Sequence, residues 1–258
     1  MTDEVLYCGV DIGSTWTKVV LADGLGRMRA KGLTRTGMSF ENAAKVGLEQ
    51  VLKEPGGTGR TIARIISTGY GRRNADFADA HRTEIICHAT GAYHYFPQAA
   101  TVIDIGGQDN KVIKMADDGT VEHFQMNRKC ASGTGAFIEE IARRLDIGLE
   151  KLEALAEAAT GDITLSSFCT VFSATEVLRL IREGEGPENI ARGIFNSVVA
   201  RVAEMGEIGD AVVLTGGVAS AFPIVARLME KKTGAVVMIP EDAQFVGALG
   251  AAILASRE

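Results

Sequence analysis

The alternation of apolar and polar positions marks two similar halves of the chain, each opening on an apolar run. The first run ends at Asp11-Ile-Gly13 and the second at Asp104-Ile-Gly106. Another strand-like run follows each of them and leads into an Asp-Gly turn, at Asp23-Gly24 and at Asp118-Gly119. Two strand-like runs beside an Asp-Gly turn are typical of a β-hairpin. The same hairpin therefore opens both halves, which favours a duplication of two α/β units over a short-period repeat.

Strand-like and helix-like runs alternate along the rest of the chain. Helical spacing of apolar residues predicts helices over 41–53, from about 88 to 95, and over 136–145, 174–181, 187–205, 222–232 and 243–255. Shorter apolar runs predict strands over 62–66, 83–87, 211–217 and 235–239. This alternation predicts an α/β fold. Because Pro97 marks the crossover, we expect one lobe over 1–97 and a second over 98–242, with the terminal helix 243–258 packed back on the first.

Composition narrows the class of protein. The chain has 258 residues, 46% of them hydrophobic, which is ample for a sizeable core. A net charge of −6 gives no electrostatic support for binding nucleic acid or an anionic membrane. The N-terminal residues lack the positive segment of a signal peptide, and no apolar run is long enough to span a membrane. We expect a cytoplasmic protein that binds neither nucleic acid nor a membrane.

The two hairpins have the composition of phosphate-binding loops. In the first, Gly13 lets the backbone approach a phosphate, Ser14 and Thr15 donate hydrogen bonds, and Lys18 supplies positive charge. In the second, Asp104-Ile-Gly-Gly-Gln108 presents the same shape. We expect the two aspartates to face each other across a cleft, where they would hold magnesium and orient a water molecule.

A third motif, Thr215-Gly-Gly-Val-Ala-Ser220, places two glycines at a strand end, where an adenosine can lie against the backbone. The chain has neither the P-loop pattern nor the Rossmann glycine pattern. The three motifs in this order resemble the superfamily of actin, hexokinase, the heat-shock chaperone ATPases and the acetate and sugar kinases. This resemblance implies an α/β fold of two similar lobes with a nucleotide cleft between them.

Two of the four cysteines precede predicted helices. Cys130 lies in the segment that leads into the helix at 136–145, and Cys169 lies shortly before the helix at 174–181. A helix N-terminus lowers the pKa of a nearby thiol and suits a thiolate that binds a negatively charged iron–sulfur cluster. A four-iron cluster is usually held by four thiolates, so two chains would share one cluster. The alternative is that both are small buried apolar residues, as we expect for Cys8 and Cys87.

With the cysteines included, the motifs resemble one family more closely. The matching segments are Gly9-Val-Asp-Ile-Gly-Ser-Thr15, Thr68-Gly-Tyr-Gly-Arg72, Val102-Ile-Asp-Ile-Gly-Gly-Gln-Asp109, Asn127-Arg-Lys-Cys-Ala-Ser-Gly-Thr-Gly135, Cys169-Thr-Val-Phe172, Thr215-Gly-Gly-Val-Ala219 and Gly247-Ala-Leu-Gly-Ala-Ala252. Together they look like the activator component of 2-hydroxyacyl-CoA dehydratases, in a broader family with the ATPase subunits of benzoyl-CoA-type reductases.

The resemblance implies a homodimeric ATPase with one [4Fe-4S] cluster at the subunit interface, held by Cys130 and Cys169 of each chain. It implies ATP/ADP with magnesium as cofactor, ferredoxin or flavodoxin as electron donor, and a 2-hydroxyacyl-CoA dehydratase as electron acceptor. The implied catalytic residues are Asp11, Asp104 and Gln108, with Asp11 and Asp104 as magnesium ligands. The implied nucleotide-binding residues are Gly13, Ser14, Thr15, Lys18, Gly106, Gly107, Gly133, Gly135, Gly216, Gly217, Val218 and Gln244.

Two other functions remain open from the sequence. The ATPase subunit of a benzoyl-CoA-type reductase would carry the same cysteine motif, although the compact length favours a free activator. A small-molecule kinase of the same fold, such as a sugar kinase, would need a base for the acceptor hydroxyl and no iron. The acyl-CoA on which a partner would act cannot be deduced, because that substrate need never touch this chain.

Overall fold

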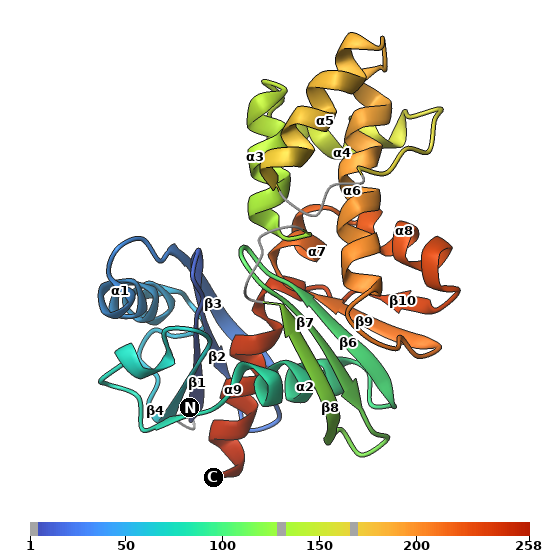
Figure 1. Cartoon of the computed structure of the whole chain (residues 1–258). Helices are drawn as coiled ribbons and strands as arrows, with labels where there is room; N and C mark the ends of the chain where they lie inside the picture. The colour runs from blue at the N-terminus through green and yellow to red at the C-terminus, as the bar shows by residue number, and fades with distance from the viewer. Residues whose placement is uncertain (1–4, 128–132, 166–169) are drawn as a thin grey trace. The chain divides into compact units, whose positions relative to one another are not determined.

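The structure, a computed structural model, describes residues 5–127, 133–165 and 170–258 (Figure 1). The chain divides into two compact units. Unit 1 comprises 1–102, 113–124 and 240–258, and unit 2 comprises 103–112 and 125–239. The lobe boundary that the sequence suggested, at residues 97 and 98, stays a prediction.

The predicted hairpin opens a five-stranded sheet in the order β3-β2-β1-β4-β5. Strands β1, β2 and β3 are antiparallel, whereas β4 runs parallel to β1 and β5 parallel to β4. Their bounds are Leu6–Ile12, Trp16–Ala22, Met28–Arg35, Ile62–Thr68 and Ala80–His81. The sequence did not predict β3, an edge strand with charged and half-buried side chains and few apolar ones.

Alternating side chains of β2 build two apolar layers on the two faces of this sheet. Val19 and Leu21 belong to the layer that includes Ala44 and Val51 of helix α1 (Phe40–Lys53). Val20 and Ala22 belong to the opposite layer, with residues of helix α9 (Val246–Arg257). The small side chains of α9 allow close packing on β1, where a Cβ on Gly9 would lie 1.8 Å from the Ala248 carbonyl oxygen.

The predicted strand over 83–87 is wrong, because a helix, α2 (Glu84–Tyr95), begins there. The Thr83 hydroxyl accepts a hydrogen bond from the Ile86 N–H at 3.4 Å, and Glu84 occupies the first turn, so capping starts a helix in a β-branched run. The strand at this point is the two-residue β5. The expectation of buried thiols is confirmed for Cys8 in β1 and for Cys87 in α2.

The second sheet has the order β10-β9-β6-β7-β8 and contains the second predicted hairpin. Its strands are β6 (Ala100–Ile105), β7 (Asn110–Met115), β8 (Val121–Asn127), β9 (Ala211–Thr215) and β10 (Val236–Met238). Strand β8 was not predicted, because most of its residues are exposed on the edge of the sheet.

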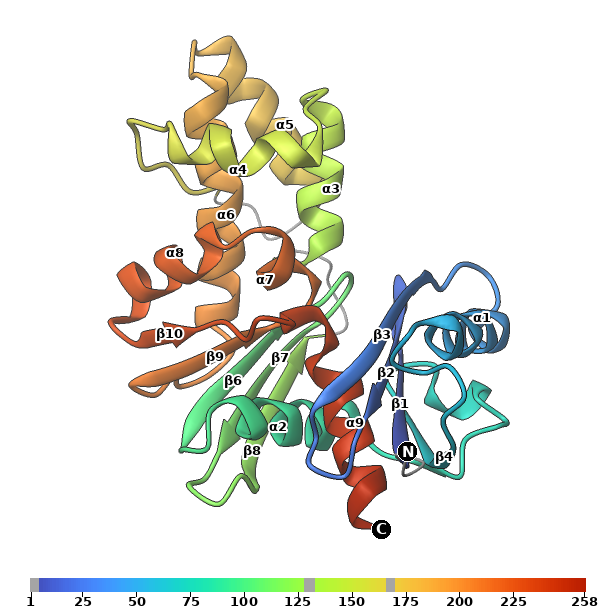
Figure 2. The ribbon, with the colours of Figure 1, turned by 180° about the vertical axis from the view of Figure 1, so that it is seen from behind.

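The described helices of unit 2 lie along the chain between β8 and β10 (Figure 2). They are α3 (Gly135–Arg144), α4 (Leu149–Glu157), α5 (Thr170–Arg182), α6 (Pro187–Ala203), α7 (Gly217–Ala221) and α8 (Ile224–Thr233). The sequence predicted all of them except α4 and the short α7. Two 3-10 turns, Arg72–Asn74 and Ala243–Phe245, complete the described elements. Within the described ranges, no helix has the length and apolar character needed to cross a membrane.

Candidate functional site

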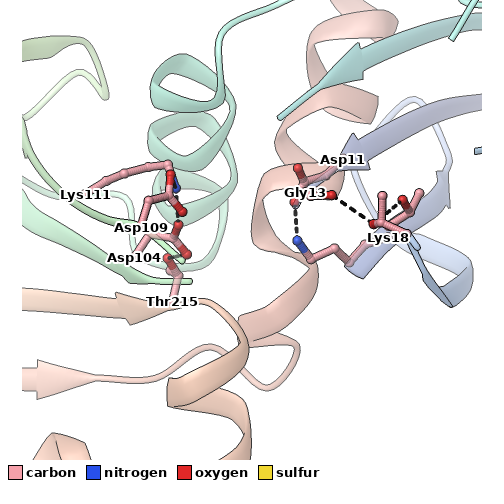
Figure 3. A network of polar contacts seen from close by, with 9 residues as sticks. Asp11, Gly13, Lys18, Asp104, Asp109, Lys111 and Thr215 are labelled. Carbon is pink, nitrogen blue, oxygen red and sulfur yellow. Dashed lines mark hydrogen bonds and ion pairs between the residues drawn. The ribbon is translucent and has the colours of Figure 1, made fainter. Parts of the chain in front are cut away.

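The first hairpin of the candidate site holds a buried ion pair beside its turn. Asp11 of β1 lies directly opposite Lys18 of β2, and the Lys18 Nζ is 2.8 Å from the Asp11 Oδ2 (Figure 3). The turn between the strands is closed by the Gly13 N–H, which donates to the Trp16 carbonyl oxygen at 3.1 Å. A Cβ on Gly13 would lie 2.8 Å from that oxygen, so the tight turn requires glycine.

The second hairpin repeats this arrangement in unit 2. The Lys111 Nζ of β7 is 2.8 Å from the Asp104 Oδ2 of β6 and 3.1 Å from the Asp109 Oδ2, and the Lys111 side chain is only 3% exposed (Figure 3). The Gly106 N–H closes the turn by donating to the Asp109 carbonyl oxygen at 2.9 Å. Lys111 was not predicted as a site residue, although the same offset from aspartate to lysine in both hairpins is visible in the sequence.

A Thr-Gly turn on a neighbouring strand, β4 in the first sheet and β9 in the second, completes each arrangement. Gly69 follows β4 with a φ of +85°, and a Cβ there would lie 2.5 Å from the Asp11 Oδ1. Gly216 follows β9 with a φ of +95°, and a Cβ there would lie 2.5 Å from the Asp104 Oδ1. Each aspartate is therefore enclosed by a lysine on one side and by glycine backbone on the other. Gly69 was quoted in a motif but was not predicted as a site residue.

The buried carboxylates can bind a cation or hold a water molecule, because their oxygens lie at strand ends beside glycine turns. Asp11 and Asp104 are each 4% exposed, so an uncompensated charge there would be costly. The lysines offset that cost within each unit. The expectation that the two aspartates face each other across a cleft stays a prediction, because one belongs to each unit.

The predicted nucleotide-binding residues differ in exposure and lie in several elements. The partly exposed residues are Gly13, Ser14, Thr15, Gly106, Gly107, Gly135, Gly217 and Gln244, and Gln108 is exposed. Gly133 and Gly216 are buried, and so is Val218, a residue of α7 that is 4% exposed. Gln244 lies in the 3-10 turn of unit 1 that precedes α9, and the others of this group from residue 106 onward lie in unit 2.

The two predicted cluster ligands, Cys130 and Cys169, lie outside the described residues. The elements that follow them are described: α5 begins at Thr170 and α3 begins at Gly135. The first turn of each helix contains no acidic residue, so the positive end of each helix dipole is not offset there. Among described residues, no group of three or more potential ligands could hold a metal ion.

Comparison with known proteins places the chain among ATPases. Residues 8–255 match the BadF/BadG/BcrA/BcrD ATPase family. The activator of lactoyl-CoA dehydratase from Anaerotignum propionicum is 40% identical over 252 residues, which cover 96% of each chain. A benzoyl-CoA reductase subunit from Thauera aromatica is 31% identical and covers 96% of this chain and 92% of its own.

Solved structures agree with this match. Component A of the (R)-2-hydroxyglutaryl-CoA dehydratase of Acidaminococcus fermentans superposes with a TM-score of 0.91 at 36% identity and 98% coverage of both chains. The activator of 2-hydroxyisocaproyl-CoA dehydratase from Clostridium difficile, solved with bound ADPNP, gives 0.89 at 34% identity and covers 98% of this chain and 94% of its own.

The broader fold is also confirmed. A ROK family glucokinase from Streptomyces griseus gives a TM-score of 0.61 at 15% identity, covering 98% of this chain and all of its own, and shows a shared fold alone. The predicted α/β fold of the actin and hexokinase type and the predicted family are thus both confirmed. This chain belongs to the BadF/BadG/BcrA/BcrD ATPase family.

Proposed function

We propose that this protein is an ATP-hydrolysing activator that delivers low-potential electrons to a 2-hydroxyacyl-CoA dehydratase. The observation that carries the proposal is the duplicated hairpin, with a buried aspartate–lysine pair in each unit, in a chain that matches dehydratase activators over nearly its whole length. A relative that matches over a similar length was solved with an ATP analogue, which supports a nucleotide site in this chain.

Residues of both hairpins bind the nucleotide in this proposal. Glycine in each turn lets the backbone approach phosphate oxygens closely, and Lys18 provides positive charge. Asp11 and Asp104 are the proposed magnesium ligands, and Asp104 with Gln108 orients the attacking water. Phosphoryl transfer depends chiefly on positioning and on charge stabilisation, so no covalent intermediate with the protein is needed.

A [4Fe-4S] cluster, when bound, would supply one-electron chemistry, with Cys130 and Cys169 of two chains as ligands. The described surroundings fit such a group, because α5 begins directly after Cys169 and neither α3 nor α5 has an acid in its first turn. Helix N-termini without acids favour thiolates over thiols. We propose that the dimer forms around this shared cluster and takes electrons from ferredoxin or flavodoxin.

The test is anaerobic reconstitution of the full chain with iron and sulfide. We expect iron near four atoms per dimer, a broad absorption band at the blue end of the visible spectrum, and ATP hydrolysis. Cys130→Ala and Cys169→Ala should lose the iron and shift the protein toward monomer. Cys8→Ser and Cys87→Ser are matched controls that should keep it, because both thiols are buried in unit 1.

The outcomes separate the candidate functions. Cys130→Ala with wild-type iron content per dimer would refute the shared cluster. A protein that binds iron but is isolated only in a hetero-oligomer would favour a subunit of a benzoyl-CoA-type reductase. The similarity to the benzoyl-CoA reductase subunit from Thauera aromatica supports this alternative. A colourless protein that releases ADP only with a sugar acceptor would identify a kinase.

A further inference from the structure

The second hairpin is tied directly to the start of helix α3. The Gly135 N–H donates to the Gly106 carbonyl oxygen at 2.9 Å, and the Ala136 N–H donates to the Gly107 carbonyl oxygen at 2.8 Å. A third hydrogen bond runs from the Asn110 Nδ2 to the Gly133 carbonyl oxygen at 2.9 Å. The hairpin therefore holds the segment entering α3 at three points.

The first hairpin has a different anchor, although its aspartate, lysine and turn glycine match those of the second. Its Gly13 carbonyl oxygen accepts from the Thr36 hydroxyl at 2.8 Å, and the Thr36 N–H donates to the Thr15 carbonyl oxygen at 3.1 Å. Thr36 directly follows β3, so this turn is fixed to the chain leaving a strand of its own sheet. The Ile12 carbonyl oxygen, just before this turn, accepts from the Gly71 N–H at 2.9 Å, where the 3-10 turn Arg72–Asn74 begins, whereas the turn of the second hairpin is bonded to the start of an α-helix.

The connection between Asn110 and α3 has little freedom to move. Asn110 is fully buried, so its amide does not exchange this partner for water. Gly133 has a φ of +80°, and a Cβ there would lie 2.7 Å from the Cβ of Arg201 in α6. Only glycine fits this position, because the space around it is filled by Arg201 of α6 and by the Asn110 side chain. A displacement of the second hairpin should therefore also displace the first residues of α3, because hydrogen bonds connect the two.

We propose that Asn110 is a positioning residue that couples the nucleotide state of the second hairpin to helix α3. The inference rests on the proposed function in one respect, namely that nucleotide phosphates bind at this hairpin. In sequence, Gly133 lies three residues after Cys130, so the residue held by Asn110 belongs to the motif that carries the proposed cluster ligand. Asn110 acts through the backbone and need not touch nucleotide or cluster.

The matched control is Asn196, in the same unit. Its Nδ2 also donates to a backbone carbonyl, that of Ile163 at 2.7 Å, as well as to the Asp162 Oδ1 at 2.8 Å, but it lies in α6, outside the second hairpin. Asn110→Ala and Asn196→Ala therefore remove the same kind of hydrogen bond. Asn110→Ser provides a second variant whose short hydroxyl can bond locally but does not reach Gly133.

The experiment is hydrogen exchange of the anaerobically prepared full chain, with and without the magnesium complex of a non-hydrolysable ATP analogue. In the wild type and in Asn196→Ala, we expect the analogue to slow exchange at the start of α3 by at least fivefold. In Asn110→Ala and Asn110→Ser, that response should fall below twofold, while affinity for the analogue stays within threefold of wild type. The midpoint potential should likewise lose its dependence on nucleotide in these two variants.

Each result decides between the proposals. A wild-type exchange response in a folded Asn110 variant overturns the inference. If neither variant folds, the wild type decides, because binding of the analogue without any change at α3 also overturns it. A wild type that binds no nucleotide refutes the proposed function instead, which is a distinguishable failure.

Discussion

Removal of the Lys111 ammonium tests whether the second hairpin depends on its buried ion pair. Lys111→Met keeps the length of the side chain but leaves Asp104, with a side chain 6% exposed, and Asp109 without their shared cation. Breaking a buried pair by removing one partner costs about 3–5 kcal/mol, because the remaining charge stays out of water. Repulsion between the two carboxylates acts in the same direction.

The loss is large enough to measure by urea denaturation of the cluster-free, nucleotide-free protein. With a urea m-value of about 2 kcal/mol/M, the midpoint of unit 2 should fall by roughly 1.5–2.5 M. Far-UV circular dichroism follows both units, whereas Trp16, the single tryptophan, lies in unit 1 and reports on that unit by fluorescence. We expect the circular dichroism transition to shift further than the fluorescence transition.

Two further variants make the result specific. Lys114→Met changes the same residue type on the same strand, but Lys114 is 62% exposed and lies 3.5 Å from Glu122, so its loss should stay below about 1 kcal/mol. The double variant Lys111→Met/Asp104→Asn removes the stranded charge of Asp104 and should recover more than half of the loss. Because Lys114 belongs to unit 1, the two variants are compared by circular dichroism, which follows both units. Equal shifts for Lys111→Met and Lys114→Met would show that the buried ion pair does not stabilise the hairpin as argued.

Three other predictions concern the chemistry and stability of single groups. Asp104→Asn should retain nucleotide affinity and reduce ATP turnover at least 100-fold, since it removes the charge that we propose holds magnesium or orients the water; wild-type turnover in a phosphate-release assay would contradict the assignment. Burial raises the pKa of the Cys87 thiol to about 12 and raises that of Cys8 still further, so iodoacetamide at pH 8 should label neither one until urea is added, as mass spectrometry would show. Burial raises the pKa of Asp23, but hydrogen bonds from the Arg27 side chain and backbone outweigh it, so the net pKa lies below the ordinary value of 3.8. The stability from Asp23 is therefore present above pH 3.8 and is lost as the pH falls through the folded-state pKa. Asp23→Asn should then lower the melting temperature at pH 7 more than at pH 3, and equal losses at both pH values would argue against this contribution.

The hairpins could be predicted from the sequence because their signals are local. Apolar runs mark β1 and β2, whose side chains are buried on both faces, and the Gly13-Ser-Thr15 segment between them marks where the chain reverses. The start of helix α2 could not be predicted from a local signal of this kind. The β-branched pair Ile85-Ile86 favours a strand, but Thr83 caps the backbone and a helix begins there instead. Edge strands β3 and β8 were missed since an exposed edge needs little apolar pattern.

The candidate site was predictable in its residue types but not in its contacts. Asp11, Gly13 and Lys18 were predicted as neighbours of a phosphate, and the structure brings them together in one hairpin. The roles of Lys111 and Gly69 depend on pairing between strands, which no local motif records. Asn110 is a still clearer case, because its partner Gly133 is brought to it by the sheet and by α3 rather than by any sequence spacing.

The comparison of the two hairpins suggests how a duplicated unit can serve two purposes. Both copies keep the aspartate, the lysine and the turn glycine, so the requirement common to both is the geometry around the carboxylate. What differs is the group bonded to the turn: Thr36, through its hydroxyl and its backbone N–H, in the first copy, and the first N–H groups of a ten-residue helix in the second. Thr36 is a single residue that follows an edge strand, whereas a helix moves as a rigid body because its own hydrogen bonds resist local distortion. The second copy is therefore the one suited to transmit a change in bound nucleotide, and substitutions at Thr36 should leave the exchange response of α3 intact while those at Asn110 abolish it.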